Sequence, residues 1–187
     1  MSLPTAPASA AASLREEFDR CFATLPVPLE PTEELLAIRV GGDSYALRLR
    51  EVAEISAGHP VSRLPSTTPH LLGLAGLRTH RAGVVVPVFS LASLLGAAGG
   101  ADAPRWLALC DAQEPFALAF DFFEGHLRLP AAALHPDVPG AARRFTSGLA
   151  RAPSANGGFI DRTLINLSLI AAALLARSDP ARRTKEQ

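Results

Sequence analysis

An internal repeat is the feature that most constrains the fold of this chain. The tripeptide Gly-Leu-Ala occurs at 73–75 and again at 148–150, and a polar tip follows each copy. The apolar run after the first copy, "VVVPVFSLASLL", matches "RTLINLSLIAAALL" after the second, with an offset of 75 residues at the glycines and 80 at the final leucines. A repeat of this length predicts two copies of one supersecondary unit, each too small to bury its own faces well.

Short strands and frequent turn signals predict a mainly β fold. Residues 35–49 alternate around Gly-Gly-Asp, which predicts a hairpin, and residues 106–120 again read as strand, polar turn, strand. Val52 and Ile55 lie three apart within 50–55, a spacing consistent with a short helical turn. Residues 90–100 predict a short helix that glycines end. We therefore expect two small β-barrels packed on each other, with few helices.

The chain divides into a folded body and two terminal segments. Residues 1–12 are rich in Ala, Ser, Pro and Thr and are expected to be disordered. Residues 13–32 predict an amphipathic helix followed by a Pro-rich linker, and the helix begins with a capping box. Its apolar stripe docks either on its own domain or on a partner. The stripe consists of Leu14, Phe18, Phe22 and Leu25. The body extends over 33–177, and a short tail over 178–187.

Composition argues against several classes of protein. The chain has 18 basic and 18 acidic residues and a formal net charge of zero, whereas proteins that bind nucleic acid usually carry a basic surplus. Its N-terminus has no apolar signal region, and no apolar run is long enough to predict a membrane-spanning helix. These features predict a cytoplasmic protein that neither binds nucleic acid nor inserts into a membrane. Cys21 and Cys110 are expected to be reduced thiols.

The sequence also lacks the residue patterns of catalysis. Its five histidines are scattered singly, none at metal-ligand spacing from a Cys or a carboxylate. There is no nucleophile motif and no glycine-rich phosphate loop. Asp121 and Glu124 are close in sequence, but residues three apart on a strand point to opposite faces, which argues against joint acid–base chemistry. We therefore expect a binding module without catalytic, metal or cofactor residues.

Several segments together, in their order and spacing, resemble the CheW-like domain of bacterial chemotaxis adaptors. The resemblance covers about Leu35 to Ala176 and rests on the segments "AIRVGGDSYALRLREVAEI", "VSRLP", "GLAGLR", "VVVPVFSL", "FALAFDFFEGHLRLPAAAL" and "TLINLSLIAAALL". It implies two packed five-stranded SH3-like barrels around a shared apolar core. It also implies a scaffold without enzymatic activity or cofactor, which joins a CheA-type histidine kinase to methyl-accepting receptors at receptor arrays.

The resemblance further implies a receptor-facing site. Arg78 matches an arginine that marks the receptor-facing side of the family, and Glu54 matches a glutamate that pairs with it. Val52 and Gly73 match positions in the same receptor-binding groove. An exposed pair of this kind contributes only about 0–1 kcal/mol, so its value would lie in shaping a contact surface.

Departures from the family pattern leave other functions open. Gly76 and Thr79 replace an Asn and a Gly around Arg78, and four extra residues lie between Arg78 and Pro87. The usual Asp is Ser90, echoed by Asn166 in the second half. One alternative is a CheW-like scaffold redirected to another partner, such as a polar-localisation or second chemosensory complex. Another is an enzyme or small-molecule binder that uses the groove between the barrels. Its only support is the ability of such folds to host binding sites.

Overall fold

The structure is a computed structural model that describes residues 30–66, 68, 70–78, 83–97, 105–136, 144–154 and 157–178. The chain divides into two compact units, Met1–Pro31 and Thr32–Gln187, and the second unit is the one described below. The predicted tail at 1–12, the predicted helix with Leu14, Phe18, Phe22 and Leu25, and the residues after 178 lie outside the described residues.

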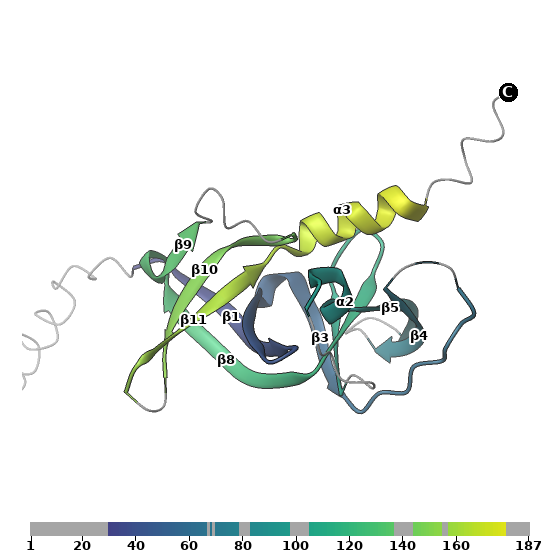
Figure 1. The fold of residues 1–187 in the computed structure, drawn as a ribbon, viewed down its shortest axis with the longest axis horizontal. Coiled ribbons are helices and arrows are strands. Elements are labelled where there is room, and N and C mark those ends of the chain that lie inside the picture. The colour runs from purple at the N-terminus through teal and green to yellow at the C-terminus, as the bar shows by residue number, and fades with distance from the viewer. Residues whose placement is uncertain are drawn as a thin grey trace, which may run out of the picture. The chain divides into compact units, whose positions relative to one another are not determined.

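Strands dominate the second unit, and they form two sheets (Figure 1). Sheet A has the strand order β8-β1-β2-β11-β10-β9, and sheet B has the order β3-β6-β7-β5-β4. The elements, in chain order, are β1 (Thr32–Val40), β2 (Asp43–Arg48), the 3₁₀ turn η1 (Leu49–Glu51), β3 (Val52–Ala57), β4 (Leu71–Arg78), β5 (Gly83–Ser90), α2 (Leu91–Leu95), β6 (Trp106–Cys110), β7 (Phe116–Phe120), β8 (Phe122–Pro130), the 3₁₀ turn η2 (Ala131–Ala133), β9 (Leu134–Pro136), β10 (Thr146–Pro153), β11 (Phe159–Ile165) and α3 (Leu167–Ser178).

The two sheets exchange hairpins. The first hairpin, β1–β2, joins the C-terminal strands in sheet A, so that the blue β1 lies among green and yellow strands in Figure 1. The hairpin β6–β7 joins β3, β4 and β5 in sheet B. Each exchanged hairpin is attached on both sides, by an antiparallel pairing (β1 with β8, β6 with β3) and by a parallel one (β2 with β11, β7 with β5). Neither half of the chain can therefore complete its sheet without the other.

Several strands are buried on both faces because each sheet packs against two cores. Side chains of Leu36 and Ile38 enter a cluster that includes residues from both sheets, such as Leu118. The alternating residue Leu35 enters a second cluster formed within sheet A, and Leu109 enters a third formed within sheet B. This arrangement explains the nearly continuous apolar runs of β1, β6 and β7, since both sides of these strands are shielded from water.

The repeat predicted from the sequence is confirmed by the backbone around Gly73 and Gly148. Both glycines have positive φ, +152° and +147°, and both lie next to a register shift of their strand. A Cβ at Gly73 would come within 2.1 Å of the carbonyl oxygen of Ser62, and one at Gly148 within 2.2 Å of that of His135. Each strand therefore needs a residue without a side chain where the chain crosses closely.

The ends of the repeat units are also equivalent. Ser90 caps α2 by accepting a hydrogen bond from the backbone of Ser93, and Asn166 caps α3 in the same way by accepting from Leu169. Both positions thus hold residue types that favour the N-cap of a helix. α2 ends at Gly96 in the left-handed conformation, as the sequence predicts for the short helix.

One local expectation is wrong. Residues 50–55 are not a helical turn: η1 ends at Glu51, and strand β3 begins at Val52. A bulge between Val52 and Glu54 shifts the register, so that Val52 and Ile55 both pack against the shared core although they are three apart. In a regular strand, only residues an even number apart would do so.

The barrel part of the expected fold is not confirmed, because hydrogen bonding leaves both sheets open. The edges of sheet A are β8 and β9, and those of sheet B are β3 and β4. The two edges of each sheet nevertheless come from neighbouring pieces of chain. β9 follows β8 after η2, and Ser62, shortly after β3, forms a bridge with Leu74 of β4.

Candidate functional site

Arg78 lies on an exposed face of the β4–β5 ladder. In this ladder Arg78 pairs with Gly83, Gly76 with Val85, and Leu74 with Pro87. Because alternate residues of a strand share a face, these side chains form one surface. We call this surface the β4–β5 face and define it by Leu74, Gly76, Arg78, Val85 and Pro87. Val85 is 72% exposed, so the face offers an exposed apolar side chain diagonally across the ladder from Arg78.

Glu54 and Arg78 are not brought together. Glu54 lies on the edge strand β3 opposite Leu109, so it faces the interior side of sheet B. Arg78 follows the buried Leu77 of the same interior cluster and therefore points to the opposite side. Among the described residues, no ion pair joins them, and one carboxylate oxygen of Glu54, Oε2, is buried without a hydrogen-bond partner.

The other two predicted site residues, Val52 and Gly73, contact the interior of the fold. Val52 is half-buried and packs against the core shared by the two sheets. Gly73 is buried where β4 touches the backbone of Ser62. A substitution at Gly73 would therefore affect the fold of β4 before it affected any surface.

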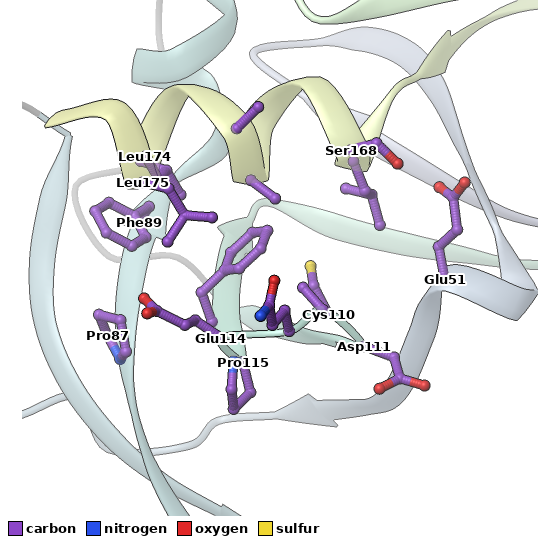
Figure 2. A pocket seen from close by; sticks show the side chains of 16 residues that line it. Glu51, Pro87, Phe89, Cys110, Asp111, Glu114, Pro115, Ser168, Leu174 and Leu175 are labelled. Carbon is purple, nitrogen blue, oxygen red and sulfur yellow. The ribbon is translucent and has the colours of Figure 1, made fainter. Parts of the chain in front are cut away.

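A groove lies beside α3, between this helix and the turn that joins β6 to β7 (Figure 2). Its volume is about 470 Å³. Most of its surface is apolar. We call it the α3 groove; it is lined by Glu51, Pro87, Phe89, Cys110, Asp111, Ala112, Gln113, Glu114, Pro115, Phe116, Leu167, Ser168, Ala171, Ala172, Leu174 and Leu175. Pro87 belongs to both the groove and the β4–β5 face, so the two surfaces are continuous.

The ionisable side chains of the α3 groove are acidic. Its lining includes Glu51, Asp111 and Glu114 and contains no Lys, Arg or His. Figure 2 shows Glu51 beside Ser168 at one end of the groove and Glu114 toward the Leu174 and Leu175 end. Burial and, next, the charge of Glu51 raise the pKa of the Cys110 thiol, so Cys110 is a neutral part of the groove floor.

Glu124 belongs to a partly buried ion network rather than to a reactive site. Its carboxylate accepts hydrogen bonds from Arg39, at 2.5 Å, and from the buried Arg162. Burial raises the pKa of Glu124, but the hydrogen bonds and charges of the two arginines outweigh this effect and lower it overall. Asp121 accepts a hydrogen bond from the backbone of Gly41 at 2.7 Å. Both carboxylates therefore have structural partners.

The described residues form two surfaces that could bind a partner, the β4–β5 face and the α3 groove. Within the described residues, no group of three or more His, Cys, Asp or Glu side chains is placed to hold a metal ion. In the same part of the chain, the helices are too short or too polar to cross a membrane.

Sequence reasoning missed the α3 groove. It is built from two segments more than 50 residues apart in the chain, 111–115 and 167–175, whose packing leaves no periodic signal. Two local features could have pointed to it. The β6–β7 turn "DAQEP" carries two acids, and three consecutive alanines in α3 leave room beside the helix.

Comparisons with known proteins extend over most of the second unit. Residues 34–167 match the CheW-like domain. A probable chemotaxis protein CheW of Rhizobium etli is 33% identical over 63 residues, which cover 34% of this chain and 38% of that protein. The fold is similar to the crystal structure of the scaffolding protein TtCheW from Thermoanaerobacter tengcongensis, with a TM-score of 0.60 and 16% identity over 73% of this chain and 90% of that one.

Proposed function

This chain belongs to the CheW-like domain family, and we propose that it is a non-enzymatic chemosensory adaptor. In this role it couples a CheA-type histidine kinase to the cytoplasmic tips of methyl-accepting receptors, and it works in the cytoplasm at receptor arrays. The observation that carries the proposal is the family match, which extends across both sheets and includes both exchanged hairpins.

The β4–β5 face supports a receptor-facing role for Arg78. Arg78 is exposed, has no ion-pair partner among the described residues, and shares this face with the exposed Val85. Arginine next to an apolar side chain is a common composition for the centre of a protein–protein contact. Glu54, Val52 and Gly73 remain proposed members of the same receptor-binding region.

A binding assay with purified partners tests the proposal. The full chain, immobilised, is expected to retain a CheA-type kinase and a receptor cytoplasmic fragment at micromolar concentrations. The Arg78→Glu variant is expected to lose receptor binding by about tenfold or more and to keep kinase binding. Arg128→Glu is the matched control, since Arg128 is exposed on β8 in the other sheet. Failure to retain either partner would refute the adaptor proposal.

A double variant with exchanged charges distinguishes two possibilities: Glu54 and Arg78 act independently, or they pair with each other in the complex. Since the two side chains face opposite sides of sheet B, we expect their effects on receptor binding to add. The Glu54→Arg, Arg78→Glu double variant should then bind no better than the weaker single variant. Recovery in the double variant would instead show that the two residues pair in the complex.

A further inference from the structure

The α3 groove has the composition of a docking site with a specific charge requirement. Its floor is apolar, with Phe89, Phe116 and Leu167 among its lining residues, whereas its three charged groups are all acidic. An apolar surface of this kind, flanked by charges of one sign, selects for a partner of the opposite sign.

Glu51 is the described lining residue that carries a buried side-chain oxygen without a hydrogen-bond partner. Its Oε2 is buried, and none of the described residues gives it a hydrogen-bond partner. The first turn of α3, which contains Ser168, lies beside it in Figure 2. A buried carboxylate oxygen without a hydrogen-bond donor is unfavourable on its own and gains most from a cationic donor.

The dimensions of the groove suit a helix. Its lining residues on α3 extend from Leu167 to Leu175, a separation of eight residue steps and therefore about 12 Å or about two turns. A helix lying in a groove of this length presents side chains at positions i, i+3, i+4 and i+7. Glu51 and Glu114 lie toward opposite ends of the groove in Figure 2. Cations about two turns apart on the incoming helix would meet one carboxylate each.

We propose that the α3 groove docks a basic amphipathic helix of a partner protein. The apolar side chains of that helix cover the groove floor, and its Arg or Lys side chains pair with Glu51 and Glu114. This site is separate from the proposed role of Arg78, although Pro87 makes the two surfaces continuous. A variant can therefore lose helix docking in the α3 groove and keep the proposed receptor contact of Arg78, or the reverse.

A designed peptide tests the proposal with the full-length chain. The probe is a fluorescein-labelled helical peptide of Leu, Ala and Arg, with leucines on one face and arginines beside them two turns apart. We expect it to bind at low salt, as measured by fluorescence anisotropy, and to bind more weakly as salt screens the charges. Two control peptides, one with Glu in place of each Arg and one with scattered leucines, are expected to bind at least about tenfold more weakly. Equal binding of all three peptides would overturn the proposal.

Variants of the chain place the peptide in the groove. Glu51→Gln with Glu114→Gln should weaken binding by about tenfold or more. Glu34→Gln with Asp161→Asn changes the net charge equally at exposed residues outside the groove and should leave binding within about twofold. Ala172→Trp should block the groove. Ala176→Trp, on an exposed position of α3 outside the lining, should not affect binding.

Two results would refute the assignment of the groove. Binding that is unchanged in both the double variant and Ala172→Trp would place the peptide elsewhere. A concentration-dependent dimer of the free chain, seen by light scattering and abolished by Ala172→Trp but not by Ala176→Trp, would show that a second copy occupies the groove. The kinase and receptor assays with Arg78→Glu are read independently of either result.

Discussion

Arg162 and Glu124 form an ion pair on the inner side of sheet A. Arg162 pairs across the ladder with Ala150, a member of the interior cluster of sheet A, and it is buried. Its Nε has no hydrogen-bond partner among the described residues, so Glu124 supplies the compensation for its charge. The network ends at the exposed Arg39, which contacts the other oxygen of the same carboxylate.

Removing Glu124 should destabilise the protein strongly. The Glu124→Ala variant leaves the Arg162 charge buried without its partner, and we expect a loss of about 3 kcal/mol in the free energy of unfolding. Asp161→Ala is the control, because Asp161 is adjacent to Arg162 in sequence but pairs with Arg151 at the surface. It should cost no more than about 1 kcal/mol. Urea denaturation measures both, and equal losses would show that burial does not determine the effect.

The lowered pKa of Glu124 predicts a specific acid sensitivity. Its folded-state pKa is below the ordinary value of 4.5, so its contribution to stability is complete above that pH and is lost as the pH falls through the folded-state pKa. A Glu124→Gln variant should therefore be less stable at pH 6.5 and lose less stability on acidification. Urea midpoints at about pH 6.5, 4.5 and 3 should converge for the two proteins. Parallel curves would contradict the assignment.

At the scale of elements, the equivalent strands β4 and β10 depend on the same local device. Gly73 and Gly148 each lie against a carbonyl oxygen of a crossing segment, in a backbone conformation that residues with side chains rarely adopt. Gly148 shares the structural role of Gly73 but not its proposed role in receptor binding. Comparing variants at the two glycines therefore distinguishes these two roles.

Alanine at either glycine should therefore destabilise the chain by a similar amount. We expect Gly73→Ala and Gly148→Ala each to lower the free energy of unfolding by more than about 2 kcal/mol, because backbone must move to admit the methyl group. Gly76→Ala, where nothing lies within 4 Å of the added Cβ, is the control and should change stability by less than about 1 kcal/mol. Thermal denaturation compares the three variants. A tolerated alanine at one of the two glycines would show that the repeat units are not equivalent there.

The elements also show what sequence patterns can predict. The hairpin β1–β2 follows the alternation around Gly41 and Gly42, and the helix α2 ends at the predicted glycine. The spacing of Val52 and Ile55 predicts a helical turn, but the segment is strand β3, whose bulge places these two residues, three apart, on one core. The register shift that causes this spacing depends on pairing with β6, which lies 50 residues further along the chain.

The candidate site was less predictable than the fold. Arg78 and Glu54 were identified through the family resemblance, but their positions on opposite sides of sheet B follow from strand register, which the sequence does not display. The α3 groove depends on how α3 packs against the β6–β7 turn. Neither segment has a pattern that reports this contact, so the unpaired oxygen of Glu51 became visible only in three dimensions.

At the scale of the whole second unit, the hairpin exchange joins the two sheets into one structure. The shared core contains side chains of β1 and β2 from sheet A together with side chains of β6 and β7 from sheet B. Separating the sheets would expose this core, and separating the two halves of the chain would leave β1–β2 and β6–β7 without the strands they pair with. The proposed adaptor role would draw on this construction, since halves that cannot separate without unfolding would hold two bound partners at a fixed relative position.

The exchange predicts that the two sheets unfold in a single transition. Trp106 is the one tryptophan of the chain; it lies on β6 in sheet B, and its ring packs 5.4 Å from that of Phe123 on β8 in sheet A. Its fluorescence should therefore follow the same urea midpoint as far-UV circular dichroism, which reports both sheets. The Glu124→Ala change, although confined to sheet A, should shift both midpoints equally. If the tryptophan midpoint stayed in place while circular dichroism moved, the sheets would be independent units, and the rigid spacing of two partners would lose its structural basis.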